Sequence, residues 1–174
     1  KIIIENYPNT SEDGKIKFAD SEAQTISEYL ESIGVYIGTD GVDSISGKTG
    51  IIYGLDGDDN ITAGADGKTT IVGGKGGDTL QRSADSTNQI YYQFDINGAG
   101  NDTIIDGLTG YSYIKFTGTD DATEYSNFIN SIEYEMSGND LVIKYGENNA
   151  NSITIQGYDI SDNLSNLYIY NSIN

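Results

Sequence analysis

The stretch Gly73-Gly-Lys-Gly-Gly-Asp78-Thr-Leu80-Gln81 decides the fold, because it joins a glycine-rich turn of six residues to three residues of strand character. Its pattern is Gly-Gly-x-Gly-x-Asp-x-apolar-x, and the glycines permit the positive φ angles that a tight turn needs. The pattern returns, with the first or second glycine replaced, in three further nonamers: Gly38–Ser46, Gly54–Thr62 and Asn97–Ile105. A short unit repeated in this way predicts turns that stack on one another around a shared core.

Two degenerate units lie between these nonamers. Gly64–Val72 has Thr69 in place of the aspartate, and Gly47–Tyr53 is shortened to seven residues, with Ile52 aligned at the aspartate position. Units with and without the aspartate therefore alternate along the chain. A single Gly-x-x-Gly-x-Asp is an ordinary surface turn, but four in near register, each followed two residues later by an apolar residue, favour a structural repeat.

The residue types of the repeat suit a hard cation. Glycines let backbone carbonyls turn toward an ion, and the aspartate adds an anionic oxygen. Calcium takes six to eight oxygen ligands, more than one turn supplies, so we expect calcium between stacked turns. The apolar residues at position eight should point into the core: Ile45, Ile61, Ile71, Leu80 and Ile104. The lysines after Gly47 and Gly67 lack the spacing of a phosphate-binding loop.

At this level of detail the nonamers resemble the haemolysin-type calcium-binding repeats of RTX proteins. Tyr92–Asp106 resembles the flank that follows such repeats, Asn139–Ile155 resembles the strand region after it, and Lys15–Asp20 resembles the end of that same region. The resemblance implies an all-β protein, a calcium-binding parallel β-roll. It also implies that two nonamers form one coil, so that alternate units stack on the same side.

This stacking places the aspartates on one side of the roll, and Ile52, Thr69 and residues 82–90 on the other. Four stacked turns enclose three gaps, so we expect about three calcium ions, mainly on the aspartate side. The predicted ligands are side chains and turn residues of the aspartate-bearing units: Asp43, Asp59, Asp78, Asp102, Gly38, Asp40, Gly41, Gly54, Asp56, Gly57, Gly73, Lys75, Gly76, Gly98 and Gly100.

The glycine distribution divides the chain into residues 1–34, 35–106 and 107–174. The first part is interpreted as a flank, the end of a preceding module, with a short helix that begins at Asp20 or Ser21, ends at Gly34 and caps the roll. The middle part is the roll. The last part is a C-terminal capping region of antiparallel strands, with alternating apolar patterns in five segments: 111–116, 132–136, 141–145, 153–158 and 167–170.

Composition excludes several classes of function. The chain of 174 residues has 27 acidic and 9 basic residues and a formal net charge of -18, which disfavours nucleic acid as a partner. It contains no cysteine or histidine, which excludes disulfides, thiolate or imidazole metal sites and a Ser–His–Asp triad. No run of residues is long and apolar enough for a membrane span. We therefore expect a non-enzymatic protein.

The resemblance implies a calcium-dependent folding and structural module of a bacterial protein secreted by the type I route, located outside the cell or at its surface. Dense negative charge predicts a chain that is disordered without calcium. One alternative is an adhesin, surface-layer or ligand-binding region that uses the roll as a stalk; another is the non-catalytic tail of a secreted protease or lipase. The 14 tyrosines leave a carbohydrate ligand open. The likeness of 2–7 to 153–158 indicates neighbouring modules in tandem, or arises by chance.

Overall fold

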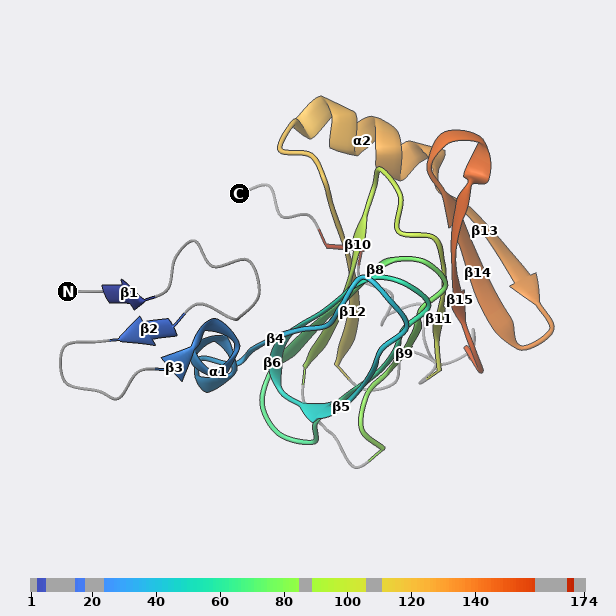
Figure 1. The fold of residues 1–174 in the computed structure, drawn as a ribbon. Helices are drawn as coiled ribbons and strands as arrows, with labels where there is room; N and C mark the ends of the chain where they lie inside the picture. Colours follow the sequence, from blue (N-terminus) through green and yellow to red (C-terminus); the bar gives the residue numbers. More distant parts are fainter. Residues whose placement is uncertain are drawn as a thin grey trace.

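The computed structural model describes residues 3–5, 15–17, 24–84, 89–105, 111–158 and 169–170. Two sheets face each other across a shared core, and the chain passes from one to the other at almost every strand, as Figure 1 shows. The first sheet has the order β16 (Ile169–Tyr170), β12 (Ser112–Thr117), β10 (Ile90–Asp95), β8 (Thr69–Lys75), β6 (Gly50–Asp56), β4 (Val35–Ile37). The second has the order β13 (Glu133–Ser137), β14 (Asp140–Tyr145), β15 (Asn151–Ile155), β11 (Asn101–Ile104), β9 (Thr79–Gln81), β7 (Asn60–Ala63), β5 (Ser44–Lys48).

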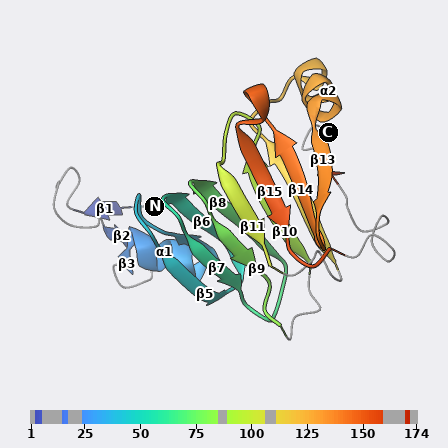
Figure 2. The ribbon, with the colours of Figure 1, turned by 90° about the vertical axis from the view of Figure 1, so that its right-hand side faces the viewer.

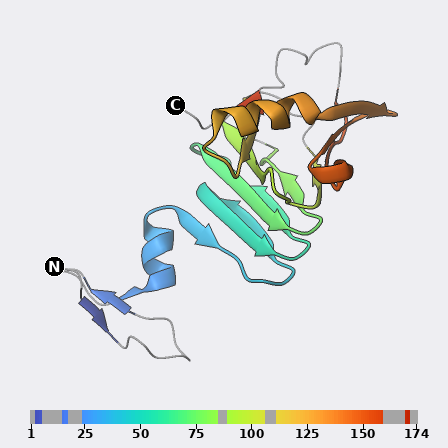
Figure 3. The same ribbon diagram turned by 90° about the horizontal axis from the view of Figure 1, so that it is seen from above.

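The strands of the repeats pair in parallel, and successive coils lie side by side (Figures 2 and 3). This confirms the predicted parallel β-roll. The parallel pairing also continues past residue 106, because β12 pairs with β10 and β15 pairs with β11. In the last part of the chain, β14 is antiparallel to both β13 and β15, so three of the five predicted antiparallel strands lie at the C-terminal edge of the second sheet. The other two segments, 111–116 and 167–170, contain the parallel strands β12 and β16 of the first sheet, so their antiparallel assignment was wrong.

The core lies between the sheets and follows the two-residue period of the strands. Position-eight residues fill it as predicted: Ile61, Ile71, Leu80 and Ile104 are fully buried, and Ile45 packs against the core from the first coil. Toward the C-terminal coils the core becomes aromatic. The centre of the Phe116 ring lies 4.9 Å from the centre of the Phe128 ring and 5.1 Å from that of the Tyr145 ring, and both contacts are edge-to-face.

A ten-residue helix, α2 (Ala122–Ser131), interrupts the coil between β12 and β15, and the sequence analysis did not predict it. The Asp121 carboxylate accepts hydrogen bonds from the N–H groups of Thr123 and Glu124, which caps the helix. Tyr125 and Phe128 are buried against the core. Together with Ile132, these residues are spaced as on one face of a helix, and this spacing is the feature of the sequence from which α2 could have been predicted.

The N-terminal helix α1 (Ile26–Ser32) follows a small antiparallel sheet of β1 (Ile3–Glu5), β2 (Lys15–Lys17) and β3 (Gln24–Thr25). Its N-cap is Thr25, so the prediction of Asp20 or Ser21 was wrong. The Thr25 hydroxyl accepts from the Glu28 N–H, and the Glu28 carboxylate accepts from the Thr25 N–H. This reciprocal pair satisfies two backbone donors, which fixes the start of the helix. The predicted end at Gly34, with φ of 76°, is confirmed.

Helix α1 lies beside β4 at the first edge of the roll (Figure 1). The Lys48 ammonium joins them, at 3.6 Å from the Glu31 carboxylate and 4.6 Å from the centre of the Tyr36 ring. The apolar residues Ile26 and Ile33 of this region remain 38% and 55% exposed. The contact between helix and roll is therefore partly polar.

Leu55 has a φ of 85°, in the region that favours glycine, and pairs with Gly74 of the next coil. We predict that Leu55→Gly stabilises the protein by about 1 kcal/mol, because relief of backbone strain exceeds the entropic cost of glycine. Denaturant unfolding in calcium measures the gain. Leu55→Ala keeps the unfavourable φ, and an equal gain from alanine would contradict the strain explanation.

Candidate metal centre

Four aspartates form a ladder along one side of the roll, at the turns that lead from the six-stranded to the seven-stranded sheet. The Asp43 N–H donates to Asp59 Oδ1 at 2.8 Å, the Asp59 N–H donates to Asp78 Oδ1 at 2.9 Å, and the Asp78 N–H donates to Asp102 Oδ1 at 2.9 Å. One oxygen of each accepting carboxylate therefore joins adjacent turns. The structure thus brings the four predicted aspartates onto one side, in the predicted order.

The second oxygen of three of these carboxylates has no hydrogen-bond partner within the described residues. These atoms are the Oδ2 atoms of Asp59, Asp78 and Asp102, whose residues are only 1–2% exposed. A buried, unpaired anionic oxygen is costly unless a cation or a proton joins it. Accordingly, burial raises the pKa of Asp59, raises the pKa of Asp78 to about 6 and raises that of Asp102 to about 7, with the neighbouring aspartates adding to each increase.

The first glycine of each turn leaves room beside these oxygens. A Cβ atom placed on Gly54 would collide with Asp59 Oδ2 and with the Gly73 carbonyl oxygen of the next turn. At Gly38 the equivalent Cβ would lie 2.6 Å from both Asp43 Oδ2 and the Gly54 carbonyl oxygen. A carboxylate of one turn and a carbonyl of the next therefore converge where only glycine fits.

The predicted residues at positions three and four hold the turns together. The Gly57 N–H donates to the Lys75 carbonyl at 2.8 Å, and the Gly76 N–H donates to the Ala99 carbonyl at 3.0 Å. The Lys75 ammonium lies 3.2 Å from the Asp56 carboxylate on the exposed surface. The glycines at position four share a positive φ in the last three turns: Gly57, Gly76 and Gly100. In the first turn, Asp40 and Gly41 are exposed.

The ends of the ladder differ from its middle. At the first turn, Asp43 Oδ2 accepts hydrogen bonds from the Thr39 N–H at 2.6 Å and the Thr39 hydroxyl at 3.0 Å, so it has partners where the other three do not. Thr39 was not predicted as part of the site. The only feature of the sequence that points to it is its position inside the first glycine-rich turn. At the last turn Asp102 pairs with Ile153, which ends the ladder of carboxylates.

The fourth turn matches the others only in its second half. Gly100 pairs with Gly76 and Gln93 pairs with Val72, so six residues (94–99) lie where three (73–75) lie in the preceding turn. Gly98 belongs to this longer loop, and a Cβ placed on it would meet the Asn151 side chain at 3.6 Å. Between these two pairs, the fourth turn is therefore three residues longer than the third.

Among the residues that the structure describes, the opposite side of the roll carries no matching aspartates. Its column pairs Gly50 with Thr69, Thr69 with Ile90, and Ile90 with Ser112. The alignment of Ile52 with the aspartate position was wrong. Ile52 pairs with Ile71 and is fully buried in the core, because the shortened unit shifts Gly50 into the turn column.

The donor set of the ladder consists of carboxylate and carbonyl oxygens, which fits a hard cation such as calcium. Within the described part of the chain, no group of three or more His, Cys, Asp or Glu side chains is arranged to hold a metal ion. Side chains alone therefore supply too few ligands, and a cation between turns would also need the glycine carbonyls. The unpartnered oxygens and the glycine positions meet that requirement.

Comparisons with known proteins support the fold. No family model matches the chain, and no curated protein matches it. The solved structure of the extracellular lipase LipA from Serratia marcescens is similar with a TM-score of 0.57 and 20% sequence identity, over 91% of this chain and 24% of the lipase chain. The chain thus spans about a quarter of that protein's length, and the likeness shows the fold, a β-roll. None of the helices in the described residues is long and apolar enough to cross a membrane.

Proposed function

We propose that this chain is a calcium-dependent folding and structural module of the RTX type. The observation that carries the proposal is the row of three buried carboxylate oxygens without partners, each beside a turn-to-turn contact. Calcium between the turns would neutralise these oxygens and link each turn to the next. About three ions would occupy the gaps, and the added +6 would change the formal net charge from -18 to -12.

The proposed mechanism is folding driven by metal binding. Without calcium, the roll must bury charged carboxylates at close spacing, which opposes folding. When a metal site forms only in the folded chain, its binding free energy adds to folding stability. The residues proposed to hold the ions are the ladder aspartates, with the turn carbonyls of the glycine positions.

We propose further that the module belongs to a larger bacterial protein exported by the type I route, and that it is not catalytic. Three features support this proposal: the absence of histidine and cysteine, the resemblance of the repeats to those of RTX proteins, and the likeness to a quarter of an extracellular lipase. A module that stays unfolded at low calcium and folds at the higher calcium outside a cell suits passage through an export channel.

Far-UV circular dichroism during a calcium titration tests the proposal, with magnesium as the control ion. We expect a cooperative gain of β-structure with calcium and little change with magnesium, because magnesium loses its water reluctantly and demands stricter geometry. A chain that is fully folded in calcium-free buffer, with no stabilisation by calcium, would overturn the proposed mechanism.

A ligand-binding region that uses the roll as its scaffold is the second candidate function. A groove on the outward face of the six-stranded sheet favours it.

A further inference from the structure

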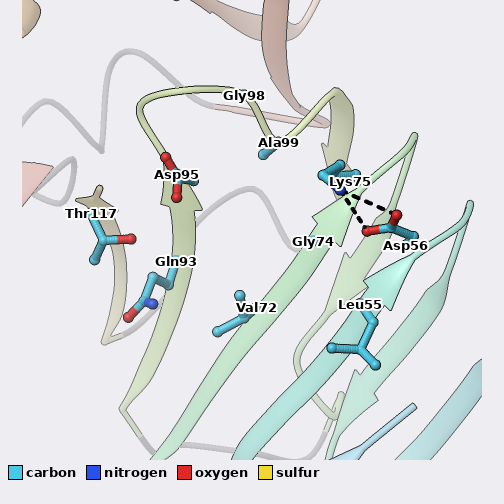
Figure 4. Close-up of a pocket in the computed structure, with 10 residues that line it drawn as sticks. All are labelled: Leu55, Asp56, Val72, Gly74, Lys75, Gln93, Asp95, Gly98, Ala99 and Thr117. Carbon is cyan, nitrogen blue, oxygen red and sulfur yellow. Dashed lines mark hydrogen bonds and ion pairs between the residues drawn. The ribbon is translucent and has the colours of Figure 1, made fainter. Parts of the chain in front are cut away.

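The outward face of the six-stranded sheet contains a cavity of about 310 Å³ that runs across β6, β8, β10 and β12 (Figure 4). Leu55, Val72 and Ala99 supply apolar surface. Gln93, Asp95 and Thr117 supply an amide, a carboxylate and a hydroxyl, and Figure 4 shows all three on neighbouring strands at one side of the cavity. Apolar surface with a few placed hydrogen-bonding groups is the usual lining of a ligand site.

The cavity follows from the irregular fourth turn. Gly74 must lack a side chain, because a Cβ there would collide with the Leu55 carbonyl of the preceding coil, and its absence leaves open space on the outward face. The longer segment 94–99 then bounds this space at its turn end, through Asp95, Gly98 and Ala99. The irregularity that departs from the repeat therefore makes the groove.

A second hollow, of about 140 Å³, lies on the same face and is lined by Lys68, Thr70, Tyr91 and Lys115. Gln93 of the first cavity pairs with Lys115, so the two hollows lie in adjacent rows of the same strands. From Thr70 to Gly74 the strand rises roughly 13 Å, so together they accommodate a short extended ligand.

The second hollow is cationic within a strongly acidic chain. Lys48, Lys75 and Lys144 form ion pairs with carboxylates, whereas Lys68 and Lys115 form none with any described residue. The Lys68 ammonium instead lies 4.4 Å from the centre of the Tyr91 ring, whose other face stacks on Tyr113 at 5.0 Å. This arrangement holds one ammonium in place while its charge remains available to an anion.

We propose that this surface binds an acidic oligosaccharide, a short chain of sugars that carry carboxylates. The Lys68–Lys115 hollow takes a sugar carboxylate, the apolar surface of Leu55 and Val72 contacts sugar C–H groups, and Gln93 and Thr117 hydrogen-bond to hydroxyls. The residues proposed to contact the sugar lie outside the aspartate ladder, so the proposal does not rest on the proposed role of the aspartates.

Trigalacturonate is the probe, with maltotriose as the neutral control, and both are added to the full chain in saturating calcium. Binding is followed by two-dimensional NMR of the backbone amides. We expect trigalacturonate to shift the amides of Thr70, Gln93 and Lys115 saturably and maltotriose to bind at least tenfold more weakly. Loss of calcium to the sugar would instead shift the amides of Asp59 and Asp78, so the two effects are distinguishable.

Lys68→Gln/Lys115→Gln should weaken trigalacturonate binding at least tenfold. Lys144→Gln on β14 removes a lysine from the other sheet and should change affinity less than twofold. Equal binding by the double variant, equal binding of maltotriose, equal binding of triglutamate, or no saturable shifts at millimolar sugar would each overturn the proposal.

Discussion

Asp78→Asn will stabilise the calcium-free protein and remove much of the stabilisation that calcium provides. The asparagine oxygen still accepts the hydrogen bond that Asp78 Oδ1 accepts from the Asp59 N–H at 2.9 Å, so the link between turns remains. The buried charge, however, disappears. Because Asp78 is 1% exposed and its second oxygen has no hydrogen-bond partner, removal of the charge helps the calcium-free fold and weakens a site that needs an anion.

Far-UV circular dichroism during calcium titrations of both proteins measures both effects. We expect Asp78→Asn to shift the calcium-free folding equilibrium toward the folded state by about 1–3 kcal/mol and to raise the calcium midpoint at least tenfold. Asp66→Asn is the matched control, because Asp66 is exposed in a turn on the opposite side of the roll. An Asp78→Asn protein that responds to calcium as the unsubstituted protein does would contradict the assignment of Asp78 as a ligand.

Without calcium, the fraction of the chain that is folded will fall as the pH rises from 4 to 8. Burial raises the pKa of Asp78 to about 6 and that of Asp102 to about 7, from 3.8, so the folded state holds protons that the unfolded state has already released. Stability is therefore greatest below the unfolded pKa and is lost as pH passes through the folded pKa values. A pKa of about 6 in place of 3.8 corresponds to roughly 3 kcal/mol for Asp78.

Calcium should reverse this dependence, because calcium and protons compete for the same oxygens. We expect calcium affinity to increase between pH 5 and pH 8, with proton release on binding. Far-UV circular dichroism in calcium-stripped buffers across this range, repeated with Asp78→Asn/Asp102→Asn, measures how far the pair controls the folded fraction. The double variant should flatten the calcium-free profile. A calcium-free protein that becomes more stable as the pH rises would contradict the burial of unpaired carboxylates in the ladder.

The repeats allowed the roll and the aspartate ladder to be predicted because each unit combines two independent constraints. Asp59 occupies the turn position of its unit and Leu80 the core position of its own unit, and these two positions lie two residues apart in every full unit. Stacking of the coils then aligns the turn residues in one row and the core residues in another. The alternation of full and degenerate units then fixes which side carries the aspartates. These are local patterns, so the sequence expresses them directly.

The departures arise where several local solutions were available. From the sequence, Ile52 could lie either in the turn, at the aspartate position, or in the core. Only the strand pairing shows that Gly50 takes the turn position and Ile52 the core position. Segment 94–99 contains three more residues than the matching segment 73–75, and the repeat pattern does not show this insertion. Thr25 outcompetes earlier capping residues because Glu28 completes the reciprocal pair. Helix α2 lies between strand patterns, and its buried face is only two residues wide, at Tyr125 and Phe128.

The groove illustrates a feature that sequence patterns do not express. Lys68, Gln93 and Lys115 are far apart in the chain and belong to no shared motif. Only the registers of β8, β10 and β12 place them on one face. Such surfaces depend on the outward residues of the strands, which the repeat leaves unspecified.

Crystals grown with calcium and measured at long wavelength would show whether the ladder holds calcium, because the anomalous signal locates the ion. We expect peaks in the gaps between successive aspartate turns, at Asp43/Asp59, Asp59/Asp78 and Asp78/Asp102, with the Oδ2 atoms of Asp59, Asp78 and Asp102 as ligands. A folded roll with no anomalous peak along this ladder at saturating calcium would contradict the proposed calcium sites.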